Sequence, residues 1–181
     1  MKKIKVIGVA AAALLAVSPL LASSTIDAAV NYNGNSYSDN QTVNVGNASF
    51  AHVALNGQVD VAAIQRAFAT PNSSVSVNLS YIETSIAGTY PVPVTVTNDS
   101  NNSSTTVTIN VTVGDSNNVQ SIQGDPDSNA GVYQINGNKV EDSGITLPVG
   151  TPVSTYGTVE INGTSYTRLN SSNSNLVVKT G

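Results

Sequence analysis

Strict alternation of apolar and polar residues in several short segments restricts this chain to a mainly-β fold. Residues 105–113 read TTVTINVTV, and the same alternation occurs in residues 90–96 (YPVPVTV) and 74–82 (SVSVNLSYI). Successive side chains of a strand point to opposite faces, so each segment has one face for a core and one for solvent. The pattern predicts an antiparallel sheet. Its core-facing residues are expected to be Val75, Val77, Leu79, Tyr90, Val92, Val94, Val96, Val107, Ile109, Val111 and Val113.

One segment, residues 59–69 (VDVAAIQRAFA), has helical periodicity instead. Three apolar residues fall on one face at the spacing of an α-helix: Val61, Ile64 and Phe68. Asp60 stands where a helix cap accepts hydrogen bonds from the first backbone N–H groups. Helix and strands together predict a small β-sandwich with one short helix over residues 49–114. The chain contains no cysteine, so this fold must rest on packed sheets and not on disulfides.

The first 28 residues have the three parts of a secretory signal peptide. Basic residues are followed by an apolar run over residues 6–21 and then by small residues. Cleavage is expected near Ala28 and Ala29, with Ala22 as a second candidate. An uncleaved anchor is the alternative, because the apolar run is long enough to span a bilayer. We therefore expect a secreted protein with no membrane contact after cleavage.

The charge of the processed chain excludes two classes of partner. After removal of residues 1–28, four basic residues stand against ten carboxylates, a net charge of −6. Nucleic-acid phosphates and anionic lipids are both bound by clustered Lys and Arg side chains. We expect neither nucleic acid nor a membrane surface as a partner.

Side chains suited to catalysis or metal binding are scarce. His52 is the only histidine, and its strand-like setting (FAHVAL) favours a structural role over a catalytic one. Residues 125–129 (DPDSN) have the ligand spacing of a calcium loop, but Ala130 replaces its glycine and Asn136 its bidentate glutamate. We expect no enzyme activity, no cofactor and no metal. A secreted hydrolase is the remaining alternative, with these candidate residues: His52, Glu83, Glu141 and Glu160.

Turn-forming residues divide the rest of the chain. Residues 29–48 are polar, with a hairpin turn expected at Asn33-Gly34, and residues 115–130 have the composition of a solvated linker. Residues 131–181 contain short strand patterns around Asn-Gly turns and three tyrosines. This last segment predicts a small SH3-like β-barrel.

Residues 131–181 also carry a specific order of motifs: VY, NG and K, then L, G, T, V and YG, then ING and Y, and a closing VK strand. This order resembles the C-terminal SLAP repeat of lactobacillus-type surface-layer (S-layer) proteins, and the middle region resembles bacterial Ig-like modules. The resemblance implies a structural or associated component of a bacterial surface layer, held non-covalently on the cell wall by residues 131–181. The alternative is an adhesion module whose Ig-like domain binds a host or partner ligand.

In that family the tail binds anionic wall polymers such as teichoic acids. The resemblance implies that tyrosine rings stack on sugars while basic side chains pair with polymer phosphates. The residues concerned are Tyr133, Lys139, Tyr156, Tyr166, Arg168 and Lys179. Three carboxylates balance the three basic residues in this segment, which predicts weak phosphate binding with little salt dependence. Wall glycan and other surface-layer subunits therefore stay open as partners, and the tyrosines fit barrel packing equally well.

Overall fold

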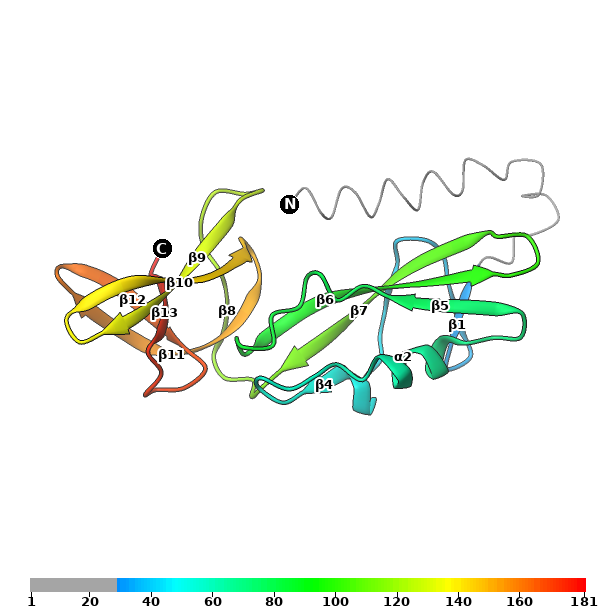
Figure 1. The fold of residues 1–181 in the computed structure, drawn as a ribbon, viewed down its shortest axis with the longest axis horizontal. Coiled ribbons are helices and arrows are strands. Elements are labelled where there is room, and N and C mark those ends of the chain that lie inside the picture. The colour runs from blue at the N-terminus through cyan, green and yellow to red at the C-terminus, as the bar shows by residue number, and fades with distance from the viewer. Residues whose placement is uncertain (1–28) are drawn as a thin grey trace.

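The computed structural model describes residues 29–181, which form a mainly-β, sandwich-type fold with one α-helix in this range. The predicted signal peptide, residues 1–28, lies outside the described residues. Two lobes follow each other along the molecule (Figure 1): an N-terminal lobe, residues 30–113, and a C-terminal lobe, residues 129–181. The prediction of a mainly-β chain with one short helix is confirmed.

Short elements dominate the N-terminal lobe and longer strands the C-terminal lobe. The first lobe comprises β1 (Val30–Tyr32), β2 (Asn35–Tyr37), β3 (Thr42–Val43), the 3-10 helix η1 (Ser49–Ala51), β4 (His52–Val53), α2 (Val61–Phe68), β5 (Ser73–Val77), β6 (Gly88–Asn98) and β7 (Ser104–Val113). β8 (Val119–Ser121) lies between the lobes. The second lobe comprises β9 (Asn129–Asn136), β10 (Lys139–Pro148), β11 (Pro152–Ile161), β12 (Thr164–Leu169) and β13 (Leu176–Lys179).

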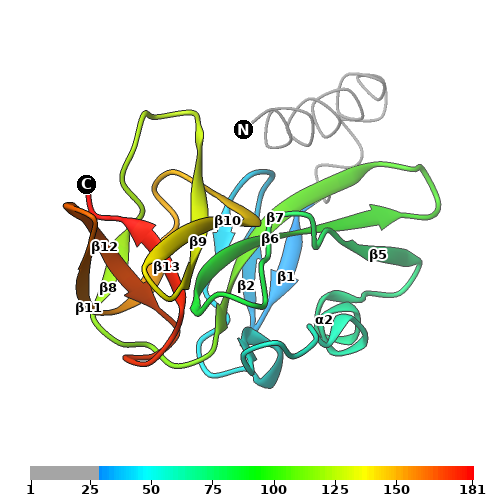
Figure 2. The same cartoon turned by 60° about the vertical axis from the view of Figure 1, so that its left-hand side comes forward.

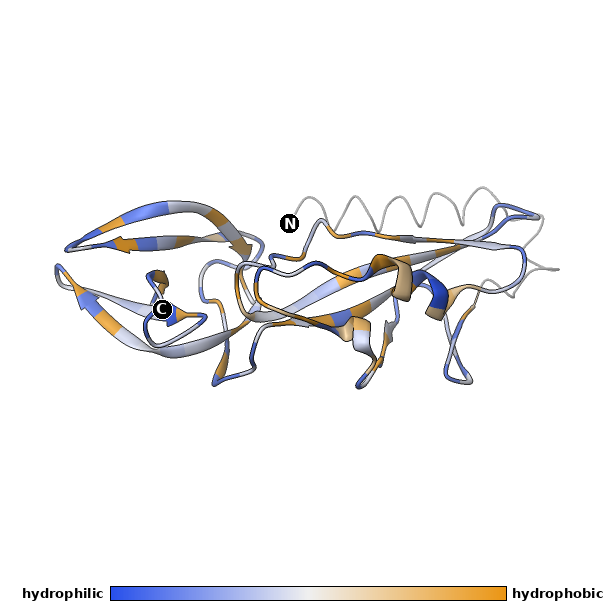
Figure 3. Cartoon of the chain, turned by 60° about the horizontal axis from the view of Figure 1, so that its bottom comes forward, coloured by the Kyte–Doolittle hydropathy of each residue, from blue (hydrophilic) through white to orange (hydrophobic). Residues whose placement is uncertain are grey.

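The β6–β7 hairpin is the centre of the N-terminal sheet. Its antiparallel register pairs Val92 with Ile109 and Val94 with Val107, and all four side chains are fully buried. β5 extends the sheet beside β6, while β3 and β4 pair with β7 in parallel. Buried and open positions alternate from Gly88 to Val92 of β6 and from Val107 to Val113 of β7, as the period-2 pattern of the sequence predicts, whereas residues 104–107 are all buried. Apolar residues of these strands and of α2 gather along the middle of the lobe in Figure 3, whereas the outer turn between β6 and β7 is hydrophilic.

Two prolines interrupt β6 without leaving a gap in the sheet. β5 pairs with β6 only from Val94 onward, so Pro91 and Pro93 lie where no strand needs a donor on that side. Proline has no N–H group and is tolerated in a sheet only at such an edge. Both prolines thus lie in the part of β6 that precedes its pairing with β5.

Helix α2 begins at the predicted cap and packs as its periodicity indicates. The Asp60 Oδ1 atom accepts a hydrogen bond of 3.0 Å from the N–H of Ala63, and Ile64 and Phe68 are buried. Phe68 stacks on Tyr32, with ring centroids 5.1 Å apart. The helix lies beside β5 (Figure 2), and its Gln65 side chain donates to the carbonyl of Val75 at 3.0 Å. This contact covers the outer edge of β5, which would otherwise expose backbone acceptors.

The strand predicted over residues 74–82 is shorter in the structure. β5 ends at Val77, because Pro93 accepts from the Asn78 N–H at 2.9 Å but has no N–H to donate in return. The chain then turns, with the Asn78 Oδ1 atom accepting from the Ser80 N–H at 2.9 Å. Leu79 is therefore not a core residue and is 37% exposed.

The polar residues 29–48 also pack into the N-terminal lobe, although the sequence placed them outside it. Four apolar side chains from this segment are buried in the core: Val30, Tyr32, Val43 and Val45. Asp39 holds the segment against β7, because its Oδ1 atom accepts from the Thr106 N–H at 2.8 Å. The expected turn at Asn33-Gly34 joins β1 to β2, with positive φ angles of 48° and 78°.

The C-terminal lobe contains one sheet in the order β10-β9-β13-β12-β11. Within residues 129–181 no ladder joins β10 to β11, so the predicted SH3-like barrel is not closed. The reason is that β11 uses its first residues to pair with β8 and β6. The tips of the two hairpins still meet, because the Asn162 Nδ2 atom donates to the Asn138 carbonyl at 3.1 Å.

Residues 115–130 are mostly exposed, as expected of a linker, but hydrogen bonds hold them against the C-terminal lobe. The Ser154 Oγ atom donates to the Asp115 carbonyl at 2.6 Å, and Thr155 Oγ1 donates to the Asn118 carbonyl at 2.6 Å. β8 pairs antiparallel with the start of β11. This segment is therefore a structural part of the junction.

A close backbone approach brings the two lobes together. Gly88, the first residue of β6, pairs with Val153 of β11, and a Cβ atom on Gly88 would lie 2.5 Å from the Pro152 carbonyl oxygen. The Asn170 side chain bridges the same junction: it accepts from the Ala87 N–H and donates to the Ser85 carbonyl, both at 2.7 Å. One cluster of buried residues consequently runs through both lobes.

Candidate binding site in the C-terminal lobe

Three of the six predicted site residues come together on neighbouring strands. Tyr133 of β9 and Tyr166 of β12 meet edge to face, with ring centroids 6.2 Å apart. The Lys179 Nζ atom of β13 lies 5.8 Å from the centroid of the Tyr133 ring. The register pairs Tyr166 with Lys179, and Tyr133 with Val177, which places these side chains on one face of the sheet.

This cluster has little open aromatic surface. Tyr166 is only 8% exposed and Tyr133 is half-buried. Lys179 occupies the remaining side of Tyr133 through a cation–π contact. A ring with these contacts contributes to packing, and less of its surface is open for a sugar to stack on.

The other three predicted residues lie apart from the cluster. Arg168 is partly buried, and its Nη1 atom donates to the Ser174 carbonyl at 2.6 Å, which holds the connection between β12 and β13. Tyr156 is half-buried where the register of β11 shifts, and Lys139 is exposed at the first position of β10. The basic side chains Lys139, Arg168 and Lys179 thus lie on three different strands.

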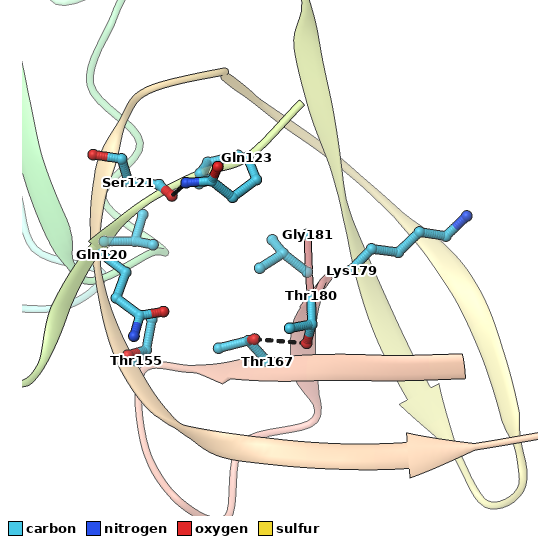
Figure 4. A pocket seen from close by; sticks show the side chains of 11 residues that line it. Gln120, Ser121, Gln123, Thr155, Thr167, Lys179, Thr180 and Gly181 are labelled. Atoms are coloured by element: carbon cyan, nitrogen blue, oxygen red, sulfur yellow. Dashed lines mark hydrogen bonds between the residues drawn. The ribbon is translucent and has the colours of Figure 1, made fainter. Parts of the chain in front are cut away.

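A pocket of about 270 Å³ lies on the opposite face of β12 and β13. Thr167 and Val178, which pair with each other across these strands, form part of its wall, and β8 with the following residues forms the facing wall (Figure 4). Its lining residues are Gln120, Ser121, Ile122, Gln123, Val153, Thr155, Thr167, Val178, Lys179, Thr180 and Gly181.

Polar groups of this pocket are amides and hydroxyls. The Gln123 Nε2 atom donates to the Ser121 carbonyl at 2.8 Å, and the hydroxyls of Thr167 and Thr180 share a hydrogen bond of 2.9 Å. The Gln120 side chain has no hydrogen-bond partner among residues 29–181. Lys179 is the only charged lining residue, and Figure 4 shows its ammonium group directed away from the pocket. No charged side chain therefore points into the pocket.

One wall of this pocket could not be found by local sequence reasoning. Residues 119–123 have a linker composition, and they become a wall only because β8 pairs with β11, more than thirty residues later in the chain. The motif order of residues 131–181 predicts tyrosines and basic residues as site residues, whereas no motif surrounds Gln120 or Gln123.

Candidate catalytic and metal-binding residues are spread over separate elements. His52 is exposed on β4, Glu83 lies in the turn before β6 and accepts from the Ser85 Oγ atom at 2.7 Å, and Glu160 is exposed on β11. Asp125 and Ser128 form a turn, since Ser128 Oγ donates to the Asp125 carbonyl at 2.6 Å. In the described part of the chain, no group of three or more His, Cys, Asp or Glu side chains is placed to hold a metal ion.

The same part of the chain contains no helix with the length and apolar character needed to span a membrane. No protein-family model matches the sequence, and no curated protein matches it significantly.

Proposed function

We propose that the protein is a structural or associated component of a bacterial surface layer, held non-covalently on the cell wall by its C-terminal lobe. We further propose that this lobe binds an uncharged wall glycan in preference to the phosphates of teichoic acid. The uncharged pocket between β8 and β13, with the Lys179 ammonium group turned away, carries this choice of ligand.

The chemistry of the pocket supports a sugar ligand. Amide groups and hydroxyls each donate and accept hydrogen bonds, as the hydroxyl groups of a sugar do. Ile122, Val153 and Val178 add apolar wall beside these polar groups, a mixture typical of small-molecule sites. A volume of about 270 Å³ fits one or two sugar units of a longer polymer.

The distribution of charge argues against phosphate as the main determinant. Tight phosphate binding uses several Lys or Arg side chains that converge on one group. Here Lys179 lies over the Tyr133 ring, Arg168 is bound to a backbone carbonyl, and Lys139 stands alone at the start of β10. Removing salt should therefore strengthen wall binding only slightly.

Binding of residues 29–181 to purified cell wall tests this proposal, with teichoic acid present or extracted and over a salt series. We expect binding to survive extraction and to change little with salt. Binding that disappears with teichoic acid would replace the glycan by the phosphate polymer. Absence of binding to either preparation would refute the wall-binding role.

A pair of glutamine variants locates the site. Gln120→Ala removes an amide that lines the pocket and has no partner among the described residues, so we expect wall binding to weaken by about 2- to 10-fold with stability unchanged. Gln134→Ala is the matched control, because Gln134 is exposed on β9 outside the pocket. Equal binding by both variants would show that the pocket is not the site.

A further inference from the structure

A second uncharged hollow lies in the N-terminal lobe, between the β1–β2 hairpin and the segment 44–48. Its volume is about 600 Å³. The lining residues are Tyr32, Asn33, Asn35, Tyr37, Asn44, Val45, Gly46, Asn47 and Ala48. None of these residues is charged, and asparagine is the commonest among them.

Several polar groups of this hollow are free to bind a ligand. The side chains of Asn33, Asn35, Tyr37 and Asn47 have no hydrogen-bond partner within residues 29–181. The Asn44 side chain is only partly hydrogen-bonded: its Oδ1 atom accepts from the Gly46 N–H at 3.0 Å, and its NH₂ group has no partner among the described residues. Each free amide offers two donors and a carbonyl acceptor.

The hollow is held in shape by the core beneath it. Tyr32 is 9% exposed, stacks on Phe68 and meets Phe50 edge to face, so the base of the hollow is fixed by three aromatic rings. Val30 anchors the same hairpin and is 1% exposed. Rigid walls lower the entropic cost of ordering a ligand.

Asn44, Val45 and Gly46 also line a neighbouring hollow of about 300 Å³, which adds the side chain of Asn110. Two hollows that share a wall fit an extended ligand with repeating polar groups better than a single small molecule. Tyr37 is half-buried and offers part of its ring as an apolar surface beside the amides.

We propose that this pair of hollows binds an uncharged oligosaccharide. Amides that donate and accept match ring and exocyclic hydroxyls, the Tyr37 ring contacts the C–H face of a sugar, and the lack of charge in the lining disfavours phosphate or carboxylate ligands. This site is distinct from the C-terminal pocket and lies in the other lobe (Figure 1). A molecule with both sites can hold two glycan chains, which goes beyond attachment to one wall polymer.

Titration of the isotope-labelled chain, residues 29–181, followed by NMR of the asparagine side-chain amides, tests the proposal. The probes are maltohexaose, cellohexaose and hexa-N-acetylchitohexaose, three neutral oligosaccharides of different linkage. We expect at least one probe to shift the amide signals of Asn33, Asn35, Asn44 and Asn47 in a saturable way. No shift of these signals with any of the three probes would overturn the proposal, as would shifts confined to Gln120 and Gln123.

Variants separate this site from the wall-binding pocket. The double variant Asn35→Ala/Asn47→Ala should weaken probe binding about tenfold or more, while Asn136→Ala, an exposed asparagine of β9, should leave it unchanged. Gln120→Ala should lower wall binding and spare the N-terminal signals. Because each site has its own variant and its own readout, failure of one proposal leaves the other intact. Equal probe affinity in the double variant and in Asn136→Ala would overturn the N-terminal site.

Discussion

The two lobes are built from similar strands, rich in valine and threonine and free of cysteine, but they differ in where their buried hydroxyl groups find hydrogen-bond partners. The N-terminal lobe buries aliphatic residues along β6 and β7 together with the aromatic rings of Tyr32, Phe50 and Phe68. Each lobe also buries four hydroxyl side chains: Ser103, Ser104, Thr105 and Thr106 in the first, and Thr151, Ser154, Thr155 and Thr167 in the second. Buried hydroxyls stabilise a fold only when each is hydrogen-bonded. In the first lobe, Ser104 and Thr106 bond to Thr97 and Thr95 of the same β6–β7 hairpin.

In the second lobe, two of the four buried hydroxyls have their partners outside the C-terminal sheet. Ser154 and Thr155 bond to residues 115–118, and Val153 pairs with Gly88 of the other lobe. The comparison teaches that the N-terminal lobe is stabilised by its own apolar core, whereas the C-terminal lobe is completed by the junction. Substitutions in the two cores and at the junction should therefore differ in size and in kind.

The largest effect is expected from the aromatic core of the N-terminal lobe. Phe68 is 1% exposed and stacks on Tyr32, so Phe68→Ala leaves a cavity and loses the ring contact. We expect the free energy of unfolding to fall by about 3–5 kcal/mol, measured by urea denaturation. Leu79→Ala is the control, since Leu79 is 37% exposed and should change stability by less than about 0.5 kcal/mol. Similar losses in both variants would contradict the proposed core.

The next effect concerns the backbone contact between the lobes. In Gly88→Ala the new Cβ atom would meet the Pro152 carbonyl oxygen at 2.5 Å, and because that neighbour is backbone, the two strands must move apart. We expect a loss of about 1–3 kcal/mol in thermal or urea unfolding. The control is Gly131→Ala, whose Cβ atom would lie 3.4 Å from the Tyr133 ring, an ordinary contact. If Gly88→Ala is as stable as the control, the lobes are joined more loosely than the structure shows.

A buried hydroxyl at the junction gives a smaller effect. Ser154 is 1% exposed, its Oγ atom donates to the Asp115 carbonyl, and it accepts from the Asn117 N–H at 3.2 Å. Ser154→Ala leaves both backbone groups without this partner, which should cost about 1–2 kcal/mol of unfolding free energy. Ser76→Ala, at an exposed position of β5, should be neutral. The expected difference between the two serines would disappear if residues 115–118 were a free linker.

Local patterns predicted the N-terminal lobe best where its elements are continuous in sequence. The alternation in residues 105–113 and the cap and periodicity of α2 are both found in the structure. The alternation wrongly predicts Leu79 as a core residue, because an alternating pattern does not show where a strand ends. Here the strand ends opposite Pro93, which has no N–H to donate to Asn78. The polar composition of residues 29–48 predicts a segment outside the N-terminal domain. In the structure Val43 pairs in parallel with Ile109, a contact that no local pattern contains.

The candidate sites depend even more on distant pairing. The resemblance implies Tyr133, Tyr166 and Lys179 as site residues, and the sheet register brings these three together. Gln120 becomes a pocket residue only through the pairing of β8 with β11, and Asn47 only through its position beside the β1–β2 hairpin. In an asparagine-rich chain, the sequence alone cannot identify which amide side chains line a binding site. The fold shows which of them lie in the same hollow.

The smallest effect at neutral pH, and the most selective at high pH, concerns Tyr90 of the N-terminal core. Tyr90 is 1% exposed, and its hydroxyl donates to the Ile86 carbonyl at 2.8 Å. Burial raises the pKa of Tyr90 well above its usual value, and the negative charge of Glu83 raises it further. Because the folded pKa lies above the unfolded value of 10.0, the unfolded chain loses this proton first. The contribution to stability is complete below pH 10 and is lost as the pH rises toward the folded pKa.

Urea denaturation at a series of pH values checks this sign. Above about pH 10, Tyr90 should lower the unfolding free energy of the wild type by about 1.4 kcal/mol per pH unit, in addition to any contribution from Tyr81, whose pKa is also raised by burial. Tyr90→Phe should cost only about 0.5–1.5 kcal/mol at neutral pH, through the lost hydrogen bond, and should remove the Tyr90 part of the slope. Tyr133→Phe, in the other lobe, should keep the wild-type slope. Equal slopes in all three proteins would mean that solvent reaches Tyr90 and that the apolar core of the N-terminal lobe is not closed to water.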